Sequence, residues 1–121
     1  MDINLAEANY TGDEDLISLI DDDTACVVVQ NPDFFGHVSD LNPLATACHE
    51  AGALLIAVVT EVVSMGAITS PGAMGADIVA AEGQSIGNAL NYGGPTVGLL
   101  AVHNKHLRQM PGRVCGQTTD T

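Results

Sequence analysis

The stretch GADIVAAEGQSIGNALNYGGPTVGLLAV, residues 75–102, holds two apolar segments joined by a polar, glycine-rich loop. Residues 77–80 and 97–102 are short and apolar enough to predict two buried strands. The polar residues between them are Glu82, Gln84, Ser85, Asn88 and Asn91, with glycines at 83, 87, 93 and 94. A polar loop that leaves a buried strand is where α/β folds usually place their sites, and glycine allows close approach of a ligand. The loop is therefore either a candidate binding site or a simple reversal of the chain.

Two more apolar segments predict strands on either side of a helix. Residues 25–30 and 53–59 are apolar almost throughout, as in parallel strands covered on both faces. The residues between them carry an apolar stripe at helical spacing, formed by Leu41, Leu44, Ala45 and Cys48. We expect this helix to have Ser39 as its N-cap, Pro43 in its first turn and Gly52 as its stop. The three elements predict a βαβ unit, with Asn31 at the edge where parallel sheets present polar groups to ligands.

The charge of the chain is strongly one-sided. Its net charge is −12, and 14 of its 15 acidic residues lie between Asp2 and Glu82, a range without lysine or arginine. Such a chain is not expected to bind nucleic acid through its phosphates. No apolar run approaches the roughly 20 residues that span a bilayer, and no secretory leader follows Met1, so we expect no membrane association. Three widely spaced cysteines, at 26, 48 and 115, fit a cytoplasmic protein better than a disulfide framework.

Several other side chains have structural interpretations that compete with functional ones. Residues 13–20 predict a helix that ends at the acidic run 21–23, which we interpret as a solvated turn. We interpret Cys48 as core packing, although a metal-ligand pair with His49 stays open. Lys105, the only lysine, follows the last strand and is interpreted as a surface charge. The neighbouring Phe34 and Phe35 need cover from this chain or from a partner. Spacing and composition alone name no reaction.

Five motifs in order extend this interpretation. They are DTACVVVQNPDFFG (23–36), PG (71–72) with GADIV (75–79), EGQSIGN (82–88), GGP (93–95) and RQMPGR (108–113). Together they resemble subunit 1 of the glycine cleavage system P-protein, glycine dehydrogenase (decarboxylating), over residues 13–120. The resemblance implies an α/β fold: part of the large domain of a fold-type-I pyridoxal-phosphate enzyme, similar to aspartate aminotransferases, with mostly parallel strands and helical crossovers. Residues 1–121 would form a single partial domain.

The resemblance also implies a function for the assembled protein. In that family glycine is decarboxylated on pyridoxal phosphate, and its aminomethyl group passes to the lipoyl arm of the H-protein. The two-subunit form keeps the cofactor lysine in subunit 2, and in this chain Gln84-Ser85 stands where the catalytic subunit has a His-Lys pair. We therefore expect no catalytic, cofactor-binding or metal-binding residue here, with pyridoxal phosphate held by the partner, and subunit 2, the H-protein and glycine as the partners. The candidates for lining the vestigial pocket or facing the partner are Asn31, Gln84, Ser85, Asn88, Gly93 and Gly94.

The chain also departs from the family pattern, and these departures limit the function expected of it. The family subunit is several times longer than this chain, so we expect an internal fragment that folds poorly and is inactive alone. Ala89 stands where the family usually has proline, and Thr69-Ser70-Pro71 replaces a Lys-Pro-Pro pattern. Two other hypotheses stay open. One is a stand-alone acidic interaction module without catalysis, which would fold cooperatively and would not bind subunit 2. The other is a small metal-binding protein that uses Cys48, His49 and nearby acids.

Overall fold

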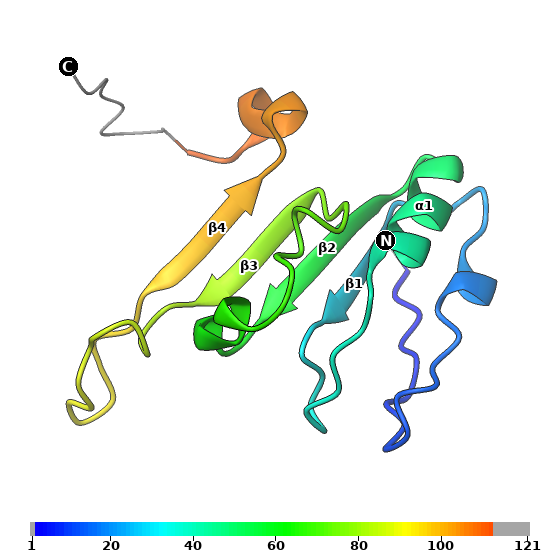
Figure 1. Cartoon of the computed structure of the whole chain (residues 1–121). Helices are drawn as coiled ribbons and strands as arrows, with labels where there is room; N and C mark the ends of the chain where they lie inside the picture. Colours follow the sequence, from blue (N-terminus) through cyan, green and yellow to red (C-terminus); the bar gives the residue numbers. More distant parts are fainter. Residues whose placement is uncertain (1, 113–121) are drawn as a thin grey trace.

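The computed structural model describes residues 2–112 (Figure 1). In chain order its elements are η1 Ile17–Leu19, β1 Cys26–Gln30, α1 Asn42–Glu50, β2 Leu54–Val59, η2 Val62–Gly66, β3 Ile78–Glu82, β4 Gly98–Val102 and η3 Asn104–Gln109, where η denotes a 3₁₀ helix. Within these residues no helix has the length and apolarity needed to cross a bilayer. Arg113 of the last motif and Cys115 lie outside the described residues.

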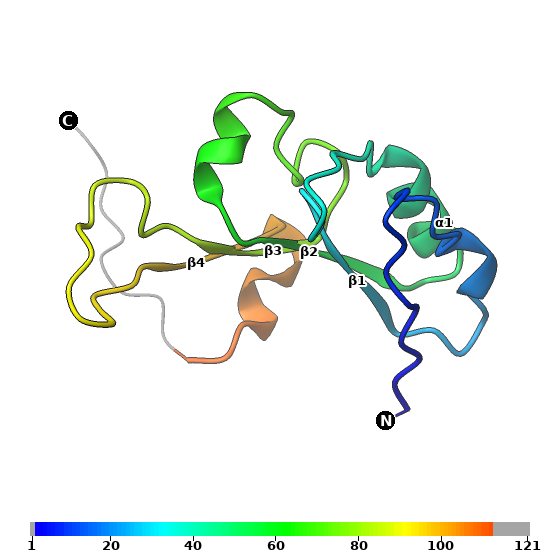
Figure 2. The same ribbon diagram turned by 90° about the horizontal axis from the view of Figure 1, so that it is seen from below.

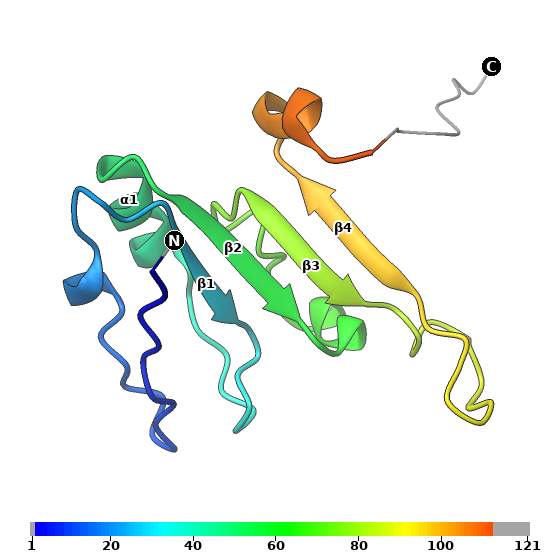
Figure 3. The ribbon, with the colours of Figure 1, turned by 180° about the vertical axis from the view of Figure 1, so that it is seen from behind.

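The strands form one sheet in the order β1-β2-β3-β4 (Figures 1 and 3). β1 and β2 pair in parallel with Val28 beside Ile56, and β2 and β3 pair in parallel with Ile56 beside Ile78. β4 runs antiparallel to β3, with Val102 beside Ile78. This mostly parallel sheet confirms the predicted α/β class. Loop 83–97 joins two antiparallel neighbours and therefore acts as a long hairpin connection.

The single α-helix supplies the crossover between β1 and β2 and packs on the sheet. Its side chains Leu44, Ala45 and Cys48 are buried in one cluster with Leu55 and Ala57 of β2. Removal of apolar area from water is the main stabilising term in such a cluster. The predicted core role of Cys48 is thus confirmed, because its side chain is completely buried.

The two ends of α1 differ in how well they were predicted. The helix begins at Asn42, so the prediction of Ser39 as N-cap is wrong. The backbone of Ser39 instead bonds to the Asn31 side chain, and the Asn42 N–H donates to Asp40 Oδ1 at 3.0 Å. Gly52 follows the helix with a φ of +77°, the left-handed conformation that stops a helix at C′, as predicted.

The helix predicted over 13–20 is reduced to η1. Asp15 explains part of this difference, because its carboxylate accepts the Ser18 N–H at 3.1 Å and its carbonyl accepts the Ser18 hydroxyl at 3.0 Å. Such local side-chain bonds compete with the helical pattern. The apolar residues Leu16 and Ile20 nevertheless pack against the core, whereas Ile17 and Leu19 of η1 are exposed.

The described residues cover one face of the sheet more fully than the other. Along β2, residues that face α1 are fully buried and their alternates are half-buried. In Figure 2, α1 and η2 lie on one side of the sheet, and η3 lies on the other. The expectation that β1 is covered on both faces is therefore wrong within residues 2–112, where Val28 at the middle of β1 is 59% exposed.

Candidate functional site

The carboxyl ends of β1, β2 and β3 lie along one border of the sheet, called here the carboxyl edge. Polar residues follow each strand: Asn31 after β1, Glu61 after β2, and Gln84 and Ser85 after β3. Open α/β sheets bind ligands outside the carboxyl ends of their strands. The carboxyl edge is therefore the candidate site, and it is where the sequence predicted Asn31, Gln84 and Ser85.

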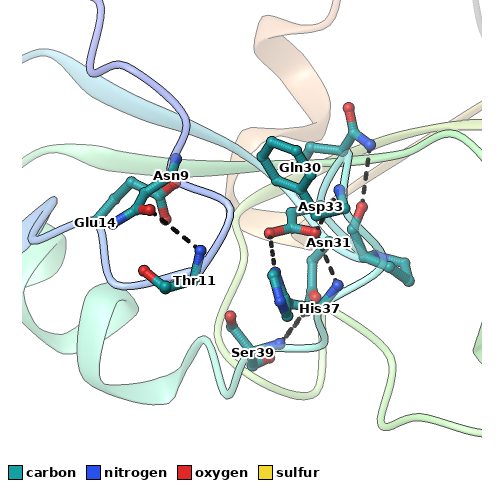
Figure 4. A network of polar contacts seen from close by, with 10 residues as sticks. Asn9, Thr11, Glu14, Gln30, Asn31, Asp33, His37 and Ser39 are labelled. Atoms are coloured by element: carbon teal, nitrogen blue, oxygen red, sulfur yellow. Dashed lines mark hydrogen bonds and ion pairs between the residues drawn. The ribbon is translucent and has the colours of Figure 1, made fainter.

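Asn31 is used inside the chain. It is only 1% exposed, and its side-chain NH₂ donates to the Ser39 carbonyl at 3.0 Å while its Oδ1 accepts the Ser39 N–H at 3.1 Å (Figure 4). Its backbone N–H donates to the Val58 carbonyl at 3.0 Å. A buried amide with its partners satisfied is a structural brace. Asn31 thus closes loop 32–38 at its base.

A second brace lies within that loop. Asp33 Oδ1 accepts the backbone N–H groups of Phe35 and His37 at 2.9 and 2.8 Å, and its Oδ2 lies 2.8 Å from His37 Nδ1 (Figure 4). Partial burial alone would raise the pKa of Asp33, but the bonds to His37 and Phe35 outweigh it and hold that pKa below its usual value. The loop therefore presents Phe34, which is 84% exposed, from an ordered frame.

Glu61 and Ser85 join the loops that follow β2 and β3. The Ser85 hydroxyl donates to Glu61 Oε2 at 2.8 Å, and the Val63 N–H donates to Glu61 Oε1 at 3.0 Å. These two bonds, the one from Val63 first, lower the pKa of Glu61, so the carboxylate stays charged. Glu61 was not among the site residues that the sequence predicted. The pairing with Ser85 spans 24 positions and has no local sequence pattern.

Loop 83–97 is closed by Glu82. The sequence had suggested that Glu82 belongs to the loop, but it is the last residue of β3. Its Oε1 accepts the N–H groups of Gln84 and Val97 at 2.8 and 3.0 Å, so one carboxylate joins both ends of the loop. Farther along, the Asn88 N–H donates to the Gln84 carbonyl at 3.0 Å. Gly93 has a φ of +94° and, with Gly94, lies in the turn near the tip of the loop.

The predicted site residues therefore fall into two groups. Gln84, Ser85, Asn88, Gly93 and Gly94 share loop 83–97, whereas Asn31 braces the separate loop 32–38. An open hollow of about 240 Å³ lies at the carboxyl ends of β2 and β3. It is lined by Val58, Val59, Thr60, Ala80, Ala81 and Glu82. Its lining is apolar apart from one hydroxyl and one carboxylate, so it offers no positive charge to an anion.

The opposite border of the sheet holds Lys105, the only lysine of the chain. Asp77, only 2% exposed, receives Lys105 Nζ at 2.7 Å on Oδ1, and on Oδ2 it receives the Leu55 N–H at 3.0 Å and lies 2.9 Å from His49 Nε2. Lys105 is a surface charge, as predicted, since its side chain is 51% exposed, and it also pairs with a buried carboxylate that the sequence did not indicate. Burial raises the pKa of Asp77, but Lys105, the Leu55 N–H and His49 together lower it well below its usual range.

The carboxyl edge does not fit pyridoxal phosphate. That group needs a lysine for its aldehyde and donors or positive charge for its phosphate. In residues 2–112 the only lysine, Lys105, is bonded to Asp77 at the opposite border, and the one arginine, Arg108, lies in η3 with it. The side chains at the carboxyl edge instead include the carboxylates of Glu61 and Glu82.

Metal ligation was the remaining alternative for Cys48 and His49. Cys48 is buried in the core, and His49 points to Asp77. Among the described residues there is no group of three or more His, Cys, Asp or Glu side chains that could hold a metal ion.

Known proteins place the chain in a family. Residues 1–121 match the sequence model of the family described as "Glycine cleavage system P-protein". The chain is 64% identical over 120 residues to a "Probable glycine dehydrogenase (decarboxylating) subunit 1" of Rhodospirillum centenum, a match that covers 99% of the chain and 27% of that protein. A protein of the same name from Methylocella silvestris is 67% identical over 107 residues, or 88% of the chain and 24% of that protein.

A solved structure agrees with these sequence matches. The fold is similar to that of an inhibitor-bound glycine decarboxylase (P-protein) of the glycine cleavage system, with a TM-score of 0.74 and 46% identity over 84% of this chain and 23% of that one. This likeness confirms the predicted fold class. The chain spans about a quarter of the length of the relatives it matches. The five motifs and the fold thus lead to the same conclusion: the chain belongs to the glycine cleavage system P-protein family.

Proposed function

We propose that this chain is a segment of the subunit of glycine dehydrogenase (decarboxylating) that bears no cofactor lysine. In the assembled enzyme, glycine would lose its carboxyl group and pass its aminomethyl group to the lipoyl arm of the H-protein. Pyridoxal phosphate, which acts as the electron sink of such reactions, would be held by subunit 2. The observation that carries the proposal is the carboxyl edge, where Ser85 bonds to Glu61 and no described residue is a lysine or arginine.

The role proposed for the segment is to support that partner. Loop 83–97 and loop 32–38 both emerge at the carboxyl edge, and each is closed by a carboxylate or amide that accepts backbone N–H groups. Exposed aromatic side chains on an ordered frame are typical anchors of protein interfaces. We propose that Phe34, with Gln84, Ser85, Asn88, Gly93 and Gly94, faces subunit 2 or the vestigial pocket. We also propose a cytoplasmic location, which suits the unpaired thiols of Cys26 and Cys48.

The test uses a hybrid subunit. This is the full-length Rhodospirillum centenum protein in which the 120 matched residues are replaced by those of the present chain. We expect the hybrid mixed with subunit 2 to release carbon dioxide from glycine in the presence of the H-protein. The 121-residue chain alone should release none, because it offers no lysine to the cofactor at its carboxyl edge.

The controls separate the competing functions. Subunit 2 without the hybrid gives the background rate of carbon dioxide release. Subunit 2 with the unmodified Rhodospirillum centenum subunit gives the full rate. Decarboxylation by the purified chain without subunit 2 would overturn the proposal. If the chain unfolds cooperatively by itself and the hybrid has no affinity for subunit 2, the acidic interaction module is the better description.

Asn31 gives a second prediction, on the hybrid subunit. We expect Asn31→Ala to cost about 1.5 kcal/mol locally, because it removes two partly buried bonds to the Ser39 backbone. Hydrogen exchange at the amides of His37 and Ser39 should accelerate by about tenfold. Asn91→Ala is the matched control, since Asn91 is exposed and uses only its backbone carbonyl, for Gly94. Unchanged exchange in Asn31→Ala would contradict the bracing role.

A further inference from the structure

The short helix η3 is attached to the sheet with little apolar contact. None of its six residues, Asn104–Gln109, is fully buried, and five of them are exposed. Even Leu107 is 48% exposed. The exception is His106, whose side chain is only 19% exposed. The position of η3 therefore depends on polar contacts, and His106 is the residue of this helix that is turned inward.

These polar contacts converge on Asp77, which immediately precedes β3. The Asp77 carbonyl accepts the His103 N–H at 2.8 Å, and Asp77 Oδ1 accepts Lys105 Nζ at 2.7 Å. His106 Nε2 lies 3.5 Å from the same Oδ1, farther than in an N–H···O hydrogen bond of about 2.9 Å. His49, near the end of α1, is bound to the other oxygen of Asp77 at 2.9 Å. One carboxylate is thus surrounded by an ammonium group and two imidazoles.

The Nε2 atom of His106 is the one part of this cluster that is left unsatisfied. It is buried and has no hydrogen-bond partner, a state that is costly and rare in folded proteins. The other ring nitrogen, Nδ1, lies 3.4 Å from Gln109 Oε1, so Nδ1 is the donor when the ring is neutral. A neutral His106 then presents the Nε2 lone pair to the carboxylate of Asp77. A proton on Nε2 converts this contact into a charge-assisted hydrogen bond.

The charges around His106 act in both directions. Burial raises the pKa of Asp77, but the bonds that it accepts, that of Lys105 first, outweigh this effect and keep the carboxylate charged. Lys105, His49 when protonated, and Arg108 in the last turn of η3 oppose a further positive charge. Lys105 is 51% exposed, so water weakens its repulsion. The net charge of −12 of the whole chain favours the added proton.

We propose that His106 is a proton-dependent latch for η3. On protonation, Nε2–H donates to Asp77 Oδ1 and fixes η3, together with the beginning of the RQMPGR motif (108–113), to the border of the sheet opposite the carboxyl edge. Histidine changes its charge between about pH 5 and pH 8. Because the closed latch binds the proton more tightly than the open one, its stabilisation is present at the lower end of this range and is lost as the pH rises.

Hydrogen exchange in the hybrid subunit at about pH 5.5 and about pH 8 tests the latch. The amide of His106, which donates to the His103 carbonyl at 2.8 Å, is followed as a protection factor, so that the intrinsic pH dependence of exchange is removed. We expect about tenfold greater protection at the lower pH, as for one hydrogen bond to a charged group. His106→Gln keeps a polar side chain but takes up no proton, so its protection should be equal at both pH values.

Two further variants identify the group that titrates. His49→Gln is the matched control, because it removes the other histidine at Asp77 and leaves His106 in place, so the pH dependence at η3 should match that of the parent. Asp77→Asn leaves His106 intact but removes the charge of its acceptor, and it should abolish the dependence.

The proposal is overturned if the parent shows equal protection at both pH values, or if the dependence survives in His106→Gln or in Asp77→Asn. A dependence that is lost in His49→Gln also overturns it, because the titrating group is then His49. The exchange is measured without subunit 2 and without glycine, so its result is independent of the proposed function.

Discussion

Asp77→Asn should loosen the amino end of the sheet more than any other single charge change in the described residues. The carboxylate is buried and receives Lys105, His49 and the Leu55 N–H, which lie in or beside three different elements. Asparagine keeps an acceptor for the Leu55 N–H but loses the charge-assisted bonds. In the variant, the half-exposed Lys105 is solvated by water instead of pairing with Asp77. The expected loss of local stability is therefore about 2 kcal/mol, near the middle of the range for hydrogen bonds to charged groups.

Hydrogen exchange in the hybrid subunit measures this cost where it arises. The amide of Leu55 should exchange about 30-fold faster in Asp77→Asn than in the parent, because each 1.4 kcal/mol corresponds to tenfold. Asp22→Asn makes the same chemical change at an exposed turn and should leave the rate unchanged. A rate ratio near one in Asp77→Asn would show that the ion pair contributes no local stability.

The pH dependence of the same ratio gives an independent check. The pKa of Asp77 is lowered in the folded state, so the unfolded chain takes up the proton more readily than the folded one. The stability from this carboxylate is therefore fully present above the unfolded value of about 3.9 and is lost as the pH falls below it. The 30-fold ratio should hold near neutral pH and should shrink toward one as the pH falls below about 4.

The strands were predictable because their signal is local. Residues 25–30 and 53–59 are apolar except for Gln30, and the structure places β1 and β2 within them. The stripe that ends in Cys48 likewise identified the buried side of α1. The start of that helix was missed by two residues, since its N-cap is Leu41 and not Ser39. The Ser39 backbone is bound by Asn31, a contact between loop and strand end that no helical pattern contains.

The roles of charged residues were harder to predict because their contacts are distant in sequence. Lys105 and His49 each lie 28 positions from Asp77, and only the fold brings them together. One signal was present. An aspartate at the start of an apolar strand needs a cation when it is buried, and the chain has only Lys105, Arg108 and Arg113 to offer. The candidate site shows the same limit, since the carboxyl edge was predicted but the pairing of Ser85 with Glu61 was not.

Gly75→Ala should be the most damaging small substitution near the core. Gly75 ends the turn before β3 with a φ of +94°, where a side chain is strained, and a Cβ built there lies 2.7 Å from the Cβ of Ala45 in α1. The conformation costs about 1–2 kcal/mol and the overlap about 1–3 kcal/mol, because the close-packed helix cannot shift freely. With a total near 3 kcal/mol, hydrogen exchange over residues 78–82 in the hybrid should accelerate by more than about 100-fold.

Two companion variants separate the two causes of this loss. Gly72→Ala lies in the same turn without a positive φ and with no atom within 4 Å of the added Cβ, so its exchange should stay close to that of the parent. Ala45→Gly removes the overlapping methyl group but leaves the strained φ. In the double variant, Gly75→Ala should therefore cost about 1–2 kcal/mol less than it does alone, a coupling typical of residues in direct contact. Equal costs in both backgrounds would show that backbone strain alone excludes a side chain at position 75, and that α1 does not depend on the close approach of this turn.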